Sequence, residues 1–210
     1  MGAIARSAAN NITTSGVFTS SAIANSSVTG ITVLANASDG ITLISSQTAS
    51  NSASLSFTSG LTSTYKAYKF VFSSIHPRTA NIFEFNMSTD GGSNYNVTKT
   101  TTFPRAYHNQ ADTSFGLDYD GGRDLAQSTA FQDIGYSDTG ASDSISGSLI
   151  LFNPSSTTYV KHFISNTTGS NFVFNFFSAG YGNTTSAVNA IQFKFESGNF
   201  DGTIYLYGIK

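Results

Sequence analysis

The sequence contains no cysteine and no tryptophan, only three prolines, and few charged residues. Without cysteine the chain cannot form disulfides, thiolate metal sites or a cysteine nucleophile. Charged residues make up 10% of the 210 positions, and ten Lys and Arg against twelve Asp and Glu leave a formal net charge of −2. This balance argues against a basic face that binds nucleic acid. No window approaches the roughly 18 apolar residues of a membrane-spanning helix. We therefore expect neither nucleic acid nor a membrane as a partner.

Sequence motifs for common enzyme chemistry are also missing. The chain has no P-loop, no G-x-G-x-x-G, no H-E-x-x-H and no G-x-S-x-G. His76, His108 and His162 have no metal-binding spacing, and the first two are predicted in loops. The two glutamates, Glu84 and Glu196, are predicted on outward strand faces, where they do not form the carboxylate pair of a glycosidase. We predict no catalytic residue, no metal and no cofactor, and hence no enzyme.

Two acidic patterns have a simpler structural interpretation. Asp138-Thr139-Gly140-Ala141-Ser142 is similar to the signature of aspartic proteases, but the chain has no second copy, and a polar loop between strands at 127–135 and 145–152 is favoured. Seven of the twelve acids lie between Asp112 and Asp143. Within them Asp118-x-Asp120-Gly121 has part of a calcium-loop pattern but lacks the closing Glu. A solvated acidic loop is the favoured interpretation.

The residues that are abundant indicate an all-β protein. Ser, Thr, Asn and Gly account for 95 of 210 residues, and the apolar content leans aromatic, with 18 Phe and 10 Tyr. From residue 48 onwards, apolar and polar residues alternate in short runs separated by Asp-Gly and Asn-Pro turns, which predicts about ten strands. The clearest runs are 67–72, 82–87, 172–176 and 191–196, and further candidates are 52–58, 94–101, 127–135, 145–152, 157–164 and 203–209. We predict an antiparallel β-sandwich, jelly-roll-like, over residues 48–210.

Residues 1–47 have a different character and form a separate predicted segment. They carry two charges and one aromatic residue, so they cannot bury enough apolar surface alone to offset their ordering entropy. Recurrent β-branched residues favour an extended arm that becomes ordered by adding strands to a neighbour, with a disordered tail as the alternative. The predicted anchoring residues of this arm are Val17, Phe18, Ile23 and Val28.

Tyrosines are the remaining candidates for contacts. Aromatic rings on the loops of a β-sandwich can stack on sugar rings or on partner chains. The alternative is that they are ordinary rim residues of a β-protein. The candidates, all predicted in or beside loops, are Tyr95, Tyr107, Tyr119, Tyr136 and Tyr181.

Three stretches carry a resemblance to a known group of proteins. They are 8–17 (AANNITTSGV) with 26–31 (SSVTGI), 149–164 (LILFNPSSTTYVKHFI) and 202–210 (GTIYLYGIK). In these stretches the chain resembles virion structural proteins of marine tailed phages, including those of cyanobacteria. The resemblance implies a component of the virion surface with a β-sandwich body and homotrimeric assembly, and it implies no site residues.

These observations lead to two expectations of function. The first is a capsid decoration or head-fibre protein, anchored by its N-terminal arm, whose partners are itself and other virion proteins such as the major capsid protein or neck and tail proteins. The second is a tail or neck fibre that binds a host surface glycan. Residues 1–18 have no continuous apolar core, so we expect no secretory signal and predict synthesis in the host cytoplasm.

Overall fold

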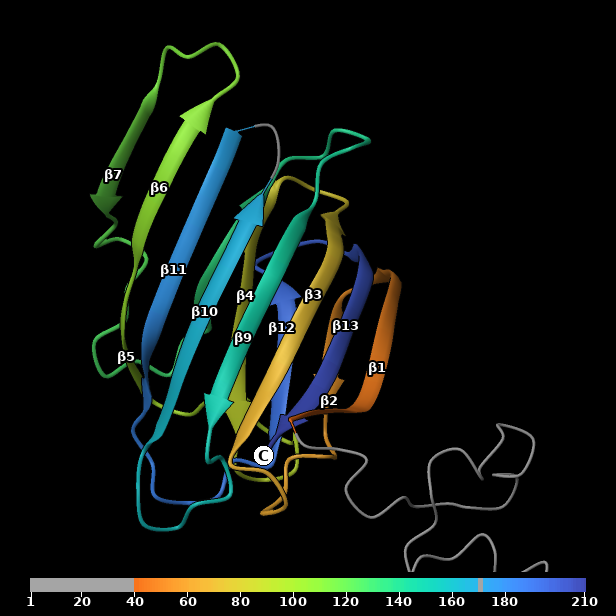
Figure 1. Ribbon diagram of the computed structural model, residues 1–210, viewed down its shortest axis with the longest axis vertical. Coiled ribbons are helices and arrows are strands. Elements are labelled where there is room, and N and C mark those ends of the chain that lie inside the picture. Colours follow the sequence, from red (N-terminus) through yellow and green to blue (C-terminus); the bar gives the residue numbers. More distant parts are fainter. Residues whose placement is uncertain (1–39, 170–171) are drawn as a thin grey trace, which may run out of the picture. The chain divides into compact units, whose positions relative to one another are not determined.

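The computed structural model describes residues 40–169 and 172–210, which form strands and no helix (Figure 1). The predicted anchoring residues Val17, Phe18, Ile23 and Val28 lie outside the described residues. Within the described part, no helix long and apolar enough to cross a membrane is found. The strands are β1 (Ile41–Ser52), β2 (Ser54–Phe57), β3 (Ala67–Pro77), β4 (Asn81–Ser88), β5 (Lys99–Thr102), β6 (Pro104–Asn109), β7 (Phe115–Tyr119), β8 (Gln132–Ser137), β9 (Ile145–Phe152), β10 (Lys161–Gly169), β11 (Phe172–Gly182), β12 (Ala190–Phe195) and β13 (Phe200–Ile209).

Eight of these strands form a jelly roll. The first four strands pair antiparallel with the last four of this set in reverse order: β1 with β13, β2 with β12, β3 with β9, and β4 with β8. The chain thus forms one long hairpin whose strands divide between two sheets, of order β1-β13-β3-β9 and β2-β12-β4-β8. This confirms the predicted antiparallel β-sandwich, and the strand order is that of a jelly roll.

Two insertions extend the larger sheet beyond the smaller one. The connection from β4 to β8 contains β5, β6 and β7, and the connection from β9 to β12 contains β10 and β11. The larger sheet continues from β9 through β10, β11 and β6 to β7, with β5 also paired to β11. We call β5, β6, β7, β10 and β11 the wing. Figure 1 shows its strands β6 and β7 projecting away from the two-layered core.

Alternating aromatic residues fill the space between the two sheets. The predicted inward residues of β3, β4 and β12 are all buried. Phe193 is fully buried, and its ring lies 5.2 Å from those of both Phe70 and Phe72, and 6.1 Å from that of Phe83. Such aromatic pairs contribute about 0.5–1.5 kcal/mol each beyond the area they bury. Phe193 therefore lies at the centre of the contacts that join the two sheets.

The structure corrects the predicted boundary of the N-terminal arm. The compact unit begins at Gly40, not at residue 48, because residues 41–47 belong to β1 and pair with β13. The sequence pattern missed this strand because β1 lies at the edge of the larger sheet. There Ile41 and Leu43 stay exposed, and the Ser and Thr residues that follow give no regular alternation of apolar and polar residues. Just before the start of β1, the Gly40 carbonyl accepts a hydrogen bond of 3.1 Å from the Lys210 N–H. The chain therefore enters the sandwich beside its C-terminus.

Other strand boundaries also differ from the prediction. Of the predicted run 94–101, only the part from Lys99 is a strand, and of 127–135 only the part from Gln132. In the irregular parts, backbone and side-chain hydrogen bonds replace a strand ladder, for example from the Asn86 amide to the Tyr95 and Thr129 carbonyls. Strands β6 and β7 were not predicted, because β6 has no regular apolar alternation and the alternation of β7 spans only five residues.

We expect Phe193→Ala to destabilise the sandwich by about 3–5 kcal/mol, because the cavity it leaves is surrounded by rings that cannot all move inward. The change is measured as the free energy of unfolding in a denaturant titration. The matched control is Tyr159→Ala, which also removes an aromatic ring but from an exposed position, and which should shift that free energy by no more than about 0.5 kcal/mol. Equal effects of the two substitutions would contradict the central role of Phe193.

Candidate functional site

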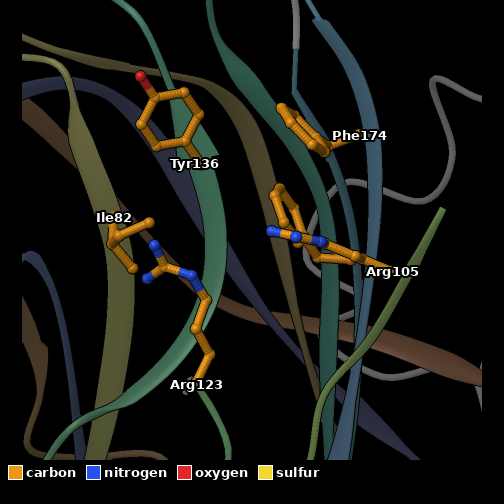
Figure 2. A pocket seen from close by; sticks show the side chains of 6 residues that line it. Ile82, Arg105, Arg123, Tyr136 and Phe174 are labelled. Atoms are coloured by element: carbon orange, nitrogen blue, oxygen red, sulfur yellow. The ribbon is translucent and has the colours of Figure 1, made fainter. Parts of the chain in front are cut away.

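A cleft of about 290 Å³ lies where the wing meets β8, the edge strand of the smaller sheet. Figure 2 shows side chains from β4, β6, β8, β11 and the β7–β8 connection facing this space. Its lining residues are Ile82, Arg105, Arg123, Tyr136, Phe174 and Phe176.

An arginine–aspartate network forms the polar part of the cleft. Arg105 on β6 binds Asp118 on β7 through two hydrogen bonds of 2.8 and 3.2 Å, and its Nη1 lies 2.9 Å from Asp120. Arg123 binds Asp133 on β8 at 2.8 Å. The hydrogen bond to Asp118 raises the pKa of Arg105, and burial raises the pKa of Asp133. The acidic segment is therefore not a single solvated loop, because three of its carboxylates pair with arginines.

Aromatic rings form the other part of the cleft. Phe174 and Phe176 stack with ring centroids 5.1 Å apart, and the Tyr136 ring meets Phe174 edge-on at 6.3 Å. The Tyr136 hydroxyl donates to Asp138 at 2.6 Å, and this bond raises the pKa of Tyr136. Ring faces beside fixed charged hydrogen-bonding groups suit a ligand with apolar faces and several hydroxyl groups, such as a sugar.

The elements that carry these side chains are fixed by buried polar residues. Gln132, at the start of β8, accepts a 2.5 Å hydrogen bond from Thr101 on β5. Its amide nitrogen donates to the Arg123 carbonyl at 3.0 Å. The alternation of β6 and β11 then places Arg105, Phe174 and Phe176 on the inner face of the wing. These residues come from distant parts of the sequence, so only the sheet order brings them together.

The outer face of the wing carries a second feature, which we call the apolar strip. On β7, Phe115, Leu117 and Tyr119 share one face, and the first two are 68% and 80% exposed. Val173 and Phe177 on β11 are exposed on the same face of the sheet, with β6 between the two strands. A hollow of about 280 Å³ lies among these strands, lined by Pro104, Arg105, Ala106, Leu117, Asn175 and Phe177.

The apolar strip lies at an open edge of the larger sheet. In the described sheet, β7 is the terminal strand and pairs only with β6. An edge strand leaves backbone donors and acceptors unpaired along one side, and proteins usually guard such edges with charge or proline. Here the exposed face carries Phe, Leu and Tyr, while Asp118 faces the other way and pairs with Arg105. Large exposed apolar patches of this kind mark protein–protein contact surfaces.

The five predicted tyrosine contacts do not form one site. Tyr136 lines the cleft, Tyr119 belongs to the apolar strip, and Tyr181 lines a separate outer hollow of about 350 Å³ beside Phe152, His162 and Ile164. Tyr95 is in a loop, as predicted, and is partly buried. Tyr107 was placed wrongly: it lies within β6, where its ring contacts Phe174 at 6.2 Å.

The residues that were considered for enzyme chemistry lie in loops and strands apart from one another. The loop containing Asp138 connects β8 and β9, as expected for a polar turn. His76 and His108 were predicted in loops but lie in β3 and β6. Glu84 projects from the face of the smaller sheet opposite the core, as predicted, but it is only 7% exposed and pairs with Lys194 at 2.6 Å. In residues 40–169 and 172–210, no three metal-ligating side chains gather.

The ends of the larger sheet are separated by the full length of its strands. Gly40, where the chain enters, lies beside Lys210, at the end where Ala67 pairs with Ile209. The β6–β7 loop and the start of β11 lie at the opposite end (Figure 1). The cleft residue Tyr136 lies at that far end too, where its backbone approaches Gly169. The entry point and the cleft thus occupy opposite ends.

Compared with protein-family models, with curated proteins and with solved structures, the chain matches none of them.

Proposed function

We propose that the protein is a structural component of a phage virion surface, a capsid decoration or head-fibre protein. In this proposal it is held on the particle by its N-terminal segment and assembles with copies of itself through the apolar strip. The observation that carries the proposal is the strip on β7, where Phe115 and Leu117 are exposed at an open sheet edge. We expect a surface of this kind to be covered permanently by another protein chain.

The composition of the molecule supports an assembly role. Ion pairs between exposed residues weaken as salt is added, whereas apolar contacts and neutral hydrogen bonds persist. Only 10% of the residues are charged, and Ser, Thr and Asn are abundant. A particle that must stay assembled in a salty medium is favoured by contacts of this type.

The fold and the resemblance support the same function class. Jelly rolls serve in viral capsids and also in lectins, so the fold alone does not choose between them. The stretches that resemble phage virion proteins include 149–164 and 202–210, which contribute strands β9, β10 and β13 of the larger sheet. A sandwich entered at one end, with its wing loops at the other, suits an appendage anchored at its base.

A second copy of the chain is the occupant that we assign to the apolar strip. The strip is the face of an edge strand, so two or more copies can bury it by packing their wings about a symmetry axis, and homo-oligomers with closed symmetry are the common case. Its central residue, Leu117, also borders the outer hollow among β6, β7 and β11. A side chain of the neighbouring copy can insert into this hollow.

We expect Leu117→Lys to convert the protein from an oligomer, expected to be a trimer, to a monomer of 22.2 kDa. Burying an unpaired lysine in a contact between copies costs several kcal/mol, while the exposed position leaves the fold intact. The mass in solution is measured by light scattering. Ser73→Lys, exposed on β3 of the same sheet, is the control and should keep the oligomer. A wild-type monomer, or an oligomer unchanged by Leu117→Lys, would contradict the assignment.

The particle assignment has its own test. A chain that begins at Gly40 retains the thirteen described strands and loses the N-terminal segment. The full-length protein should co-sediment with phage particles, and the shortened chain should stay in the supernatant because its anchor is gone. Circular dichroism of the shortened chain confirms that its β-structure persists. Co-sedimentation of both chains at equal occupancy would refute anchoring by the N-terminal segment.

The cleft favours a second candidate function, a tail or neck fibre that binds a host surface glycan. It lies at the end of the sheet away from Gly40 and combines the Phe174 ring with the Arg123–Asp133 pair. If the protein binds host polysaccharide, Phe174→Ala should weaken binding about tenfold, equivalent to about 1.4 kcal/mol. Tyr159→Ala, an exposed ring at the opposite end of β10, is the control. Absence of binding by the wild-type protein would exclude this function.

A further inference from the structure

A second buried cluster, separate from the aromatic core, lies under the β4–β8 connection. Glu84, Asn86 and Ser88 alternate with the core residues of β4, so they project from the opposite face of the smaller sheet. The connection covers this face, and Asn86 and Lys99 are both fully buried there. The Lys99 Nζ lies 2.5 Å from the Asn86 Oδ1 and 2.8 Å from the Val97 carbonyl oxygen.

The Asn86 amide is held in one orientation. Its nitrogen donates to the Tyr95 and Thr129 carbonyls at 2.8 and 2.9 Å, and its oxygen accepts from the Met87 N–H at 2.8 Å. Carbonyls accept and N–H groups donate, so this set of partners excludes the flipped amide. A C=O bond is about 1.2 Å long, so with Nζ and Oδ1 2.5 Å apart the amide carbon lies within about 3.7 Å of Nζ. The amine is held close to attack distance.

The Lys99 amine is in a state that can attack. Burial lowers its pKa to about 7, and this effect outweighs the attraction of the Glu84 carboxylate, which acts in the opposite direction. About half of the amine is therefore neutral at pH 7, whereas an ordinary lysine is almost fully protonated. Lys161 offers a comparison: it is also buried, but its Nζ donates to the Tyr159 and Thr184 backbone carbonyls, and no side-chain amide is among these partners.

We propose that Lys99 and Asn86 form an intramolecular isopeptide bond. The neutral Nζ attacks the Asn86 side-chain carbon and forms an N–C bond. The bond from that carbon to Nδ2 then breaks, one proton passes from Nζ to Nδ2, and ammonia leaves. No oxidant or further reactant is consumed. The Tyr95 and Thr129 carbonyls, which hold the Nδ2 hydrogens, accept hydrogen bonds from the departing ammonia.

The bond would join β4 to the start of β5 and close a covalent ring through residues 86–99. This ring ties the β4–β8 connection, which carries β6, β7 and Arg123, to the smaller sheet. Closing a loop covalently restricts the unfolded chain in the same way as a disulfide, which the cysteine-free sequence cannot form. The wing would then stay fixed when the protein is pulled or heated.

The test is mass spectrometry of the denatured full-length protein after incubation at pH 8. Loss of ammonia lowers the mass by about 17 Da relative to the unmodified chain. Trypsin then separates the possible sources of this loss, since it does not cleave after an acylated lysine. An isopeptide yields one peptide covering residues 79–105, with no backbone fragment ions between positions 86 and 99, whereas an unlinked chain is cut after Lys99.

Lys99→Arg is the informative variant, because arginine keeps a long side chain with hydrogen-bond donors but is not a nucleophile. It should have the full mass expected from its sequence, while Lys161→Arg, the matched control, should keep the loss of about 17 Da. A wild-type protein of unmodified mass overturns the proposal. So does a loss of about 17 Da with normal cleavage after Lys99, which indicates a cyclic imide at an asparagine.

Discussion

Burial of alternating aromatic side chains between two sheets is the constraint on which the rest of this structure depends. Phe70, Phe72, Phe83 and Phe193 meet only if strands from the first half of the chain face strands from the second half. The reversed pairing of eight strands satisfies this requirement and keeps every pair antiparallel. The two insertions add Val97, Phe163 and Val188 to this core and otherwise extend the larger sheet beyond β9.

The two insertions then create the candidate contact surfaces of the molecule. Both contribute strands to the larger sheet, where β6 of one pairs with β11 of the other. Their meeting produces the cleft on the inner face and the apolar strip on the outer face. The same β4–β8 connection covers one face of β4 and buries Lys99 against Asn86. One connection thus supplies strands β6 and β7 of the wing and also buries a hydrogen-bonded polar cluster against the smaller sheet.

The sequence by itself determined the class of fold and the composition of its core. Strict alternation at 67–72, 82–87 and 191–196 is sufficient to assign strands and their buried faces, because a strand repeats every two residues and water selects which face is apolar. The absence of cysteine likewise excludes disulfides whatever fold the chain adopts. The sequence pattern did not reveal β1, β6 or β7, because β1 and β6 lack a clear apolar period and the alternation of β7 is only five residues long.

Only the tertiary structure decided where the candidate contact surfaces lie. Arg105, Arg123, Tyr136 and Phe174 are spread over some seventy residues, and strand order alone places them around one cleft. Glu84 was expected at the surface because it alternates with core residues, but alternation specifies a face and not whether another segment covers that face. The Lys99–Asn86 contact has the same origin, since side-chain pairing depends on how a connection folds over a sheet, and that path has no local signature in the sequence.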